Sequence, residues 1–244
     1  MSSALATIDL NQLPSTQLGS DDAYADLAKG GEFLGYIKLC NSDKYVKRNL
    51  IPNGHFGIPR SKDEIDDLGE TIDFLPLARR PKAIDMGDLS AIITSYDEES
   101  DVFKAIRARS TETGSACQWG TSFLVLERLT GRFLEFFLGT VSCRPEAKNI
   151  FPCMPLSQAD IDRRAAAGAD VSDLEAHFAL PVTIKAKLKE NKKGMWYSPV
   201  AVKCSQPFTK LPATAVIVSE IGKFLTIKSG GVEKAEDTRK QRAR

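Results

Sequence analysis

Two apolar runs separated by three turn residues place the strongest limit on the fold of this chain. Residues 122–128 read Ser-Phe-Leu-Val-Leu-Glu-Arg, residues 132–138 read Arg-Phe-Leu-Glu-Phe-Phe-Leu, and Leu-Thr-Gly lies between them. Aromatic and β-branched residues in runs of this length favour strands, and a short connection with glycine favours a hairpin. Both alternate faces of the runs are largely apolar. We therefore expect this hairpin in the middle of a sheet that is covered on both sides.

A second hairpin is predicted further along the chain. Residues 183–189 alternate strictly, with apolar residues on one face and lysines on the other. Residues 190–194 form a turn, and residues 195–204 form the returning strand. Neighbouring side chains in a strand point to opposite faces, so either Trp196 or Tyr197 must face inward.

Helices are predicted between and after the hairpins. The pattern Ser157-Gln-Ala-Asp160 is a capping box that opens an alanine-rich segment, and a second such box begins at Ser172, so a helical insert is expected at about 157–178. A third capping box, Ser95-Tyr-Asp-Glu98, predicts a helix that continues toward residue 109. Pro212 and the apolar residues that follow it at helical spacing predict a C-terminal helix.

Residues 71–86 are β-prone but contain Pro76 and Pro81. Proline cannot donate a hydrogen bond to a neighbouring strand, so this segment is expected to be an edge strand or to bend around a corner. The predicted fold class is α+β and mainly β. It consists of an antiparallel sheet, open or closed into a barrel, with a helical insert and a C-terminal helix.

The predicted organisation is a single globular domain between two arms. Residues 1–20 are rich in Ser, Thr, Gln and Asn and are expected to form a flexible N-terminal arm. The domain spans residues 21–229 and opens with a short helix at about 21–29. Residues 230–244 form a charged tail with a basic end.

Hydropathy and cysteine usage predict a cytoplasmic protein. The longest apolar stretches fall far short of the roughly 20 residues that a membrane span needs, and no basic segment precedes an apolar run at the N-terminus. The five cysteines are widely spaced and include no C-x-x-C pair, which is typical of reduced thiols buried as small apolar side chains.

The chain contains none of the short motifs that identify common catalytic centres. It has no phosphate-binding loop, dinucleotide-binding glycine pattern, nucleophile elbow or zinc-protease helix. The two histidines, His55 and His177, are isolated and predict neither a metal site nor a general base. We therefore expect a protein that is not an enzyme and has no cofactor or metal.

The most informative feature is a basic hairpin with aromatic residues. Single-stranded nucleic acids need cations for their phosphates and aromatic faces for their unstacked bases. A lysine-rich strand that is merely solvated or protected against edge pairing would have a similar sequence. Arg79-Arg80-Pro81-Lys82 is a second basic segment, for which surface solvation is again the simpler explanation. The candidate nucleic-acid-binding residues are Lys185, Lys187, Lys189, Lys192, Lys193, Trp196, Tyr197, Arg79, Arg80 and Lys82.

The arrangement resembles the oligonucleotide-binding (OB) barrels of phage-type single-stranded-DNA-binding proteins. The likeness lies in two hairpins with a helical segment between them, a basic and aromatic hairpin, and a C-terminal helix. Residues 73–85 are also similar to uncharacterised phage proteins of DNA metabolism. The resemblance implies an OB-like barrel and a non-catalytic, single-stranded nucleic-acid-binding role in replication or recombination. The alternative is a structural or assembly protein, such as a virion component, that oligomerises through its terminal arms.

Overall fold

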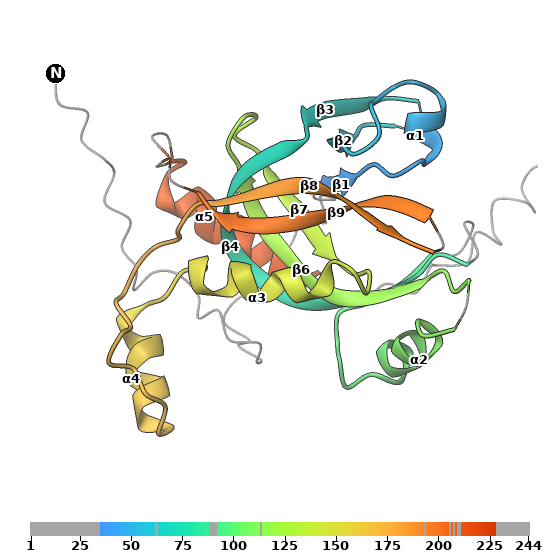
Figure 1. Ribbon diagram of the computed structural model, residues 1–244. Coiled ribbons are helices and arrows are strands. Elements are labelled where there is room, and N and C mark those ends of the chain that lie inside the picture. Colours follow the sequence, from blue (N-terminus) through green and yellow to red (C-terminus); the bar gives the residue numbers. More distant parts are fainter. Residues whose placement is uncertain are drawn as a thin grey trace, which may run out of the picture.

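A computed structural model describes residues 35–227 except 62, 88–91, 113, 193, 205, 207, 209 and 210. The predicted arms and the helix at 21–29 lie outside these residues. One open sheet of nine strands organises the described part, in the order β3-β2-β1-β7-β6-β4-β8-β9, with β5 also paired to β4 (Figure 1). The strands are β1 (Tyr36–Leu39), β2 (Phe56–Pro59), β3 (Ile65–Gly69), β4 (Thr71–Asp85), β5 (Ile93–Ser95), β6 (Cys117–Glu127), β7 (Phe133–Leu138), β8 (Val182–Asn191) and β9 (Gly194–Lys203).

The predicted fold class is confirmed, with the sheet open. All strand pairs are antiparallel except β1 with β7, which are parallel. Both predicted hairpins are present, as β6–β7 and β8–β9, and β4 joins them in the same sheet. The β8–β9 turn is shorter than expected, because the strands continue until Asn191 pairs with Gly194.

The long strand β4 accommodates its two prolines at positions that need no donor. Asp73 accepts a hydrogen bond from Arg128 on the β6 side, so the backbone N–H of every second residue from there points to β6. An irregularity in register between Pro76 and Ala78 shifts this alternation by one residue. At both Pro76 and Pro81, the backbone nitrogen, which carries no hydrogen, therefore points away from β6. Since β8 pairs with residues 71–74 and β5 with residues 83–85, neither strand needs a donor from either proline.

Five α-helices surround the sheet in the described residues, and the predictions for them had mixed success. They are α1 (Lys44–Lys47), α2 (Asp101–Arg109), α3 (Ala147–Ile150), α4 (Gln158–Ala166) and α5 (Thr214–Thr226). Helix α4 has the predicted Ser157–Asp160 capping box, and α5 is the predicted C-terminal helix. None of these helices is long and apolar enough to cross a membrane.

Three details of the helix predictions are wrong. The segment after Ser172 forms no helix, so the insert is shorter than 157–178. The N-cap of α2 is Ser100, five residues after the predicted cap Ser95, and the Ser100 hydroxyl accepts from the Phe103 N–H. Residues 144–153 were not predicted to be helical, yet they form α3 between the short 3-10 helices Arg144–Glu146 and Phe151–Cys153.

Helical segments cover the two faces of the sheet, and the two largest hydrophobic clusters lie beneath them. On one face, α3 and its flanking turns pack on a cluster that includes Phe74, Phe123 and Phe136. On the other face, α5 packs Ile217, Ile221 and Phe224 against β4 and β6. Figure 1 shows α3 and α5 on opposite sides of the sheet. The apolar β6–β7 hairpin is therefore buried from both sides, as its sequence predicts.

The outer edge of β9 is blocked by side chains. The Asn41 amide spans the backbone of Tyr197: its Nδ2 donates to the carbonyl at 2.9 Å and its Oδ1 accepts from the N–H at 2.6 Å. Two residues on, Pro199 has no N–H to offer. After two more, the Ala201 N–H donates to the Glu146 carboxylate at 3.0 Å. The three successive outward positions of this edge strand are therefore closed to pairing with another chain.

We predict that Asn41→Asp destabilises the fold by about 1–3 kcal/mol. A carboxylate still accepts from the Tyr197 N–H but cannot donate to its carbonyl, which is left without a partner. Urea unfolding measures the change. The control is Asn53→Asp, in the loop that follows α1, because the Asn53 Oδ1 accepts from Ser42 and an aspartate oxygen does the same. Equal unfolding midpoints for the two variants would contradict the role given to Asn41.

Candidate nucleic-acid interface

The lysines of β8 and the indole of Trp196 occupy one face of the β8–β9 hairpin. The register pairs Lys189 with Trp196, and directly opposed residues in antiparallel strands point to the same face. Lys185 and Lys187 precede Lys189 at two-residue intervals and are exposed, while Lys189 and Trp196 are half-buried. Lys192 is exposed in the turn, and Lys193 lies outside the described residues. This lysine face, residues 185, 187, 189 and 196, unites four of the predicted site residues.

The charges of the lysine face are not neutralised by carboxylates. Among the described residues, none of Lys185, Lys187, Lys189 and Lys192 lies within 4.0 Å of an acidic oxygen. The Nζ of Lys189 donates to the backbone carbonyl of Ser142 at 3.4 Å, and the Ser198 hydroxyl donates to the same carbonyl at 3.3 Å. The face is thus cationic, and the turn before α3 supports its end.

Tyr197 lies on the opposite face of the hairpin and packs inward. A Cβ on Gly54 would lie 2.7 Å from the Tyr197 ring, so the ring rests against the Gly54 backbone. Gly54 has a φ of +87°, a conformation that other residues rarely adopt. The indole of Trp196 is therefore on the lysine face, and the tyrosine ring anchors the hairpin to the loop that precedes β2.

The second predicted basic segment does not form a surface patch. Arg79 and Arg80 point to opposite faces of β4, as neighbours in a strand must. The guanidinium of Arg79 lies 4.3 Å from the centroid of the Phe151 ring, and burial lowers its pKa, with a smaller contribution from the charge of Arg164. Arg80 is only 5% exposed, and Lys82 is half-buried. The expected exposure of this segment is wrong, because helices cover both faces of β4.

Arg80 and Lys82 are instead held by a buried carboxylate on β7. Glu135 contacts the Lys82 Nζ at 2.7 Å and the Arg80 guanidinium at 3.6 Å, and it accepts a hydrogen bond from the Ser122 hydroxyl. Burial raises the pKa of Glu135, but the charge of Lys82 and these hydrogen bonds outweigh it and hold the pKa below its ordinary value of 4.5. The carboxylate is therefore ionised in the folded protein at neutral pH.

Arg80 also fixes the end of α5. Its guanidinium donates to the backbone carbonyls of Phe224 and Ile227 and lies 3.6 Å from the centroid of the Tyr96 ring. A cation at the carboxyl end of a helix is favoured by the helix dipole. Burial lowers the pKa of Arg80, while Tyr96 and Glu135 act in the opposite direction. Arg80 and Lys82 thus form ion pairs and hydrogen bonds within the folded protein instead of a surface patch.

A second cationic and aromatic group was not predicted from the sequence. The guanidinium carbons of Arg107 on α2 and Arg144 lie 4.3 and 4.2 Å from the centroid of the Trp119 ring on β6. Their positions are 107, 119 and 144, too far apart for a local pattern to reveal. Only the packing of α2 and the turn before α3 on β6 brings them together.

Comparison of the chain with models of protein families, with curated proteins and with solved structures found no match. The resemblance to single-stranded-DNA-binding proteins therefore stays a prediction, and the function is argued from the geometry alone.

We predict that Glu135→Gln costs about 3–5 kcal/mol of stability at neutral pH, because it leaves Arg80 and Lys82 buried without their counter-charge. A carboxyl whose pKa is lowered by folding stabilises the protein fully above its unfolded pKa. That contribution is lost as the pH falls through the folded value. Urea midpoints of the wild type should therefore fall below about pH 4.5, and the difference between wild type and variant should shrink there. The exposed substitution Glu112→Gln is the control, and a constant difference across this range would contradict the assignment.

Proposed function

We propose that the protein binds single-stranded nucleic acid without catalysis, in the cytoplasm, as in the replication or recombination of phage-type DNA. The observation that carries the proposal is the pairing of Lys189 with Trp196, which sets an indole beside three lysines on one face. The cations attract phosphates, and the aromatic ring offers a surface on which a base stacks. An unstacked base is available only in a single strand, so this combination favours single strands over duplexes.

Edge protection is a weaker explanation of the lysines. Lysine on an edge strand prevents pairing with other chains. At the end of the sheet, the outward positions of β9 are already closed by Asn41, Pro199 and Glu146. Lys185 lies where β8 pairs with both β9 and β4, so it has no open edge to protect, and only Lys187 and Lys189 lie beyond the residues of β8 that pair with β4. Their uncompensated charge is better explained by an anionic ligand.

Assembly is the second candidate function, and one observation favours it. On the face of the hairpin opposite the lysines, Leu188 and Met195 are 50% and 68% exposed. Exposed apolar side chains at the end of a projecting hairpin suit a contact with a second copy of the chain. The predicted role of the terminal arms lies outside the described residues. Gel filtration with and without an oligonucleotide separates the candidates: binding gives a salt-sensitive complex, and assembly gives an oligomer that ignores the oligonucleotide.

The lysine face predicts a defined response to salt. For the double substitution Lys185→Gln and Lys187→Gln, we expect weaker binding of a single-stranded oligonucleotide. Its affinity should also depend less steeply on salt. The magnitude of the negative slope of log K against log salt should be smaller by about 0.7 for each phosphate that the variant no longer binds. Fluorescence anisotropy at several salt concentrations measures it. The charge-matched control is Lys47→Gln with Lys104→Gln, two exposed lysines on α1 and α2. Equal slopes for the two double variants would reject the lysine face.

The two aromatic residues of β9 predict opposite effects. Trp196→Ala should lower affinity by about tenfold, equivalent to about 1.4 kcal/mol of stacking, with little change in melting temperature. Tyr197→Ala should be less stable by about 1–3 kcal/mol and melt earlier, because it removes the ring that packs on Gly54, and should bind nearly as well when folded. Affinity and thermal midpoint are measured on the same preparations. If both variants melt earlier and bind as the wild type does, the hairpin is structural and the assembly role gains support.

A further inference from the structure

Arg107, Arg144 and Trp119 form a compact cationic group at the surface. Arg107 is exposed on α2, while Arg144 and Trp119 are half-buried. Arg144 reaches the indole by crossing β6 at Gly120, where a Cβ would lie 3.2 Å from the Arg144 Cγ. Both guanidinium groups contact the same indole ring, which holds them in place despite their like charge.

Among the described residues, the two guanidinium groups lack the aspartate partners that several other arginines have. Arg60, Arg109, Arg128 and Arg163 each pair with an aspartate. Within the described residues, no carboxylate lies within 4.0 Å of Arg107 or Arg144, and the Nε of Arg144 is buried without a hydrogen-bond partner. Burial and the charge of Arg107 lower the pKa of Arg144, against the opposing influence of Cys143. A guanidinium group without counter-charge suits an anion that accepts several hydrogen bonds, and a phosphate does so.

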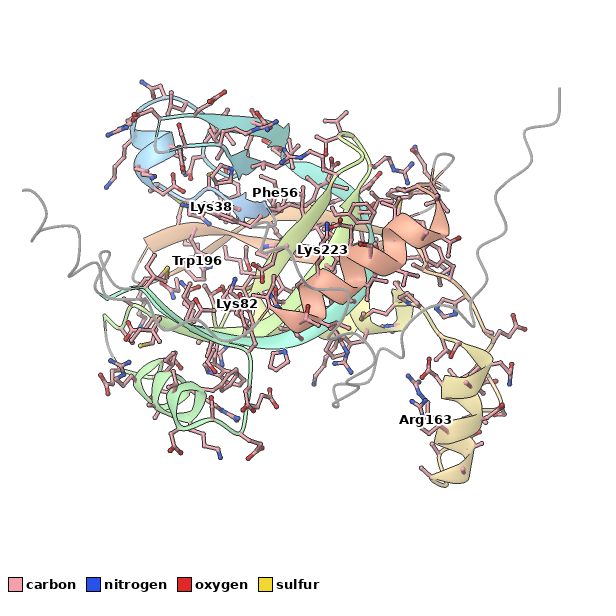
Figure 2. All side chains as sticks on the ribbon, turned by 180° about the vertical axis from the view of Figure 1, so that it is seen from behind. Lys38, Phe56, Lys82, Arg163, Trp196 and Lys223 are labelled. Atoms are coloured by element: carbon pink, nitrogen blue, oxygen red, sulfur yellow. The ribbon has the colours of Figure 1, made fainter. Side chains whose placement is uncertain are left out.

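This arginine pair adjoins the lysine face through one turn. Ser142, whose carbonyl accepts from Lys189 and Ser198, lies two residues before Arg144. Figures 1 and 2 both show the tip of the β8–β9 hairpin at the same end of the molecule as α2. In Figure 2, the labelled Trp196 lies on this side. The turn at residues 142–144 therefore links the lysine face to the arginines on Trp119, although these residues come from distant parts of the sequence.

We propose that Arg107 and Arg144 bind phosphates of the same single strand that the hairpin binds, so that the strand runs from the lysine face across residues 142–144 to α2. This inference rests on the proposed function. Trp119 acts here as the support that holds the two guanidinium groups, and Trp196 remains the ring on which a base stacks. The bound segment of the strand is thus longer than the hairpin alone would cover. Its phosphates bind arginine at one end and lysine at the other.

Arg107→Gln and the double substitution Arg107→Gln with Arg144→Gln test this path. Binding of a fluorescent oligothymidylate of about 20 nucleotides is measured across salt concentrations. We expect the magnitude of the negative slope of log K against log salt to be smaller by about 0.7 for each phosphate that is no longer bound. This difference is a factor of about five in affinity per decade of salt. Arg109→Gln is the matched control on the same helix, because Arg109 already pairs with Asp85 at 2.6 Å. Arg107 is exposed, so its substitution leaves the fold intact even if the Arg144 variant is unstable.

The outcomes separate this inference from the function on which it rests. If the wild type binds, the lysine variants weaken binding and Arg107→Gln matches Arg109→Gln, the arginine path is wrong and the hairpin site stands. If the wild type binds no oligonucleotide at low salt, both proposals fail. If log K depends less steeply on log salt for Arg107→Gln than for the wild type, and Arg109→Gln shows no such change, the path is supported.

Tryptophan fluorescence gives an independent readout. The chain has two tryptophans, so Trp196→Phe leaves Trp119 as the only one. In that protein, we expect an unlabelled oligonucleotide to change the Trp119 emission, because its phosphates bind the guanidinium groups that contact the indole ring. The change should disappear when Arg107→Gln is added. Emission that stays constant while the oligonucleotide binds would overturn the proposal.

Discussion

The architecture depends on a constraint within β4: its two prolines cannot donate hydrogen bonds, yet it pairs with three other strands. The irregular register after Pro76 turns the missing N–H of both prolines away from β6, so the β4–β6 ladder continues past them. On the other side, β8 pairs only with the first part of β4 and β5 only with the last. The β8–β9 hairpin is therefore attached to the sheet by its base, and the lysines at 187 and 189 lie beyond that attachment.

The partition of positive charge follows from the same sheet. Glu135 interrupts the otherwise apolar strand β7 and is buried, so it requires cations. Arg80 and Lys82 supply them from β4, on the same face of the sheet and on the far side of β6. Arg80 in turn holds the carboxyl end of α5 in place. The cations of the β8–β9 hairpin have no such carboxylate among the described residues. The basic residues thus divide into a buried set that stabilises the fold and an exposed set that is available to a ligand.

The sequence predicted the features that depend on local patterns. Alternation identified the two hairpins, the lysine face and the opposite orientations of Trp196 and Tyr197, and the Ser157–Asp160 spacing identified the start of α4. It failed where distant residues decide the outcome. Arg79-Arg80-Pro81-Lys82 reads as a surface patch, because nothing nearby in sequence shows that Glu135 and the helices cover it. The same alternation, applied to β4, would have separated Arg79 from Arg80, and a lone acid within residues 133–138 signals a buried partner. Nothing local links Arg107 and Arg144 to Trp119.

The two faces of the β8–β9 hairpin have different roles: one anchors the hairpin to the rest of the protein, and the other carries the residues of the proposed site. One face fixes the hairpin through the Tyr197 ring on Gly54, and the Asn41 amide holds the outer edge of β9 at the Tyr197 backbone. The other presents lysines and Trp196, with Ser142 bracing Lys189 and Ser198 from the turn that leads to Arg144. A ligand that binds to such a preformed surface orders few protein groups, so more of the attraction between phosphates and cations remains as affinity. Because alternate residues of one strand separate anchoring from binding, stability and affinity can vary independently at neighbouring positions.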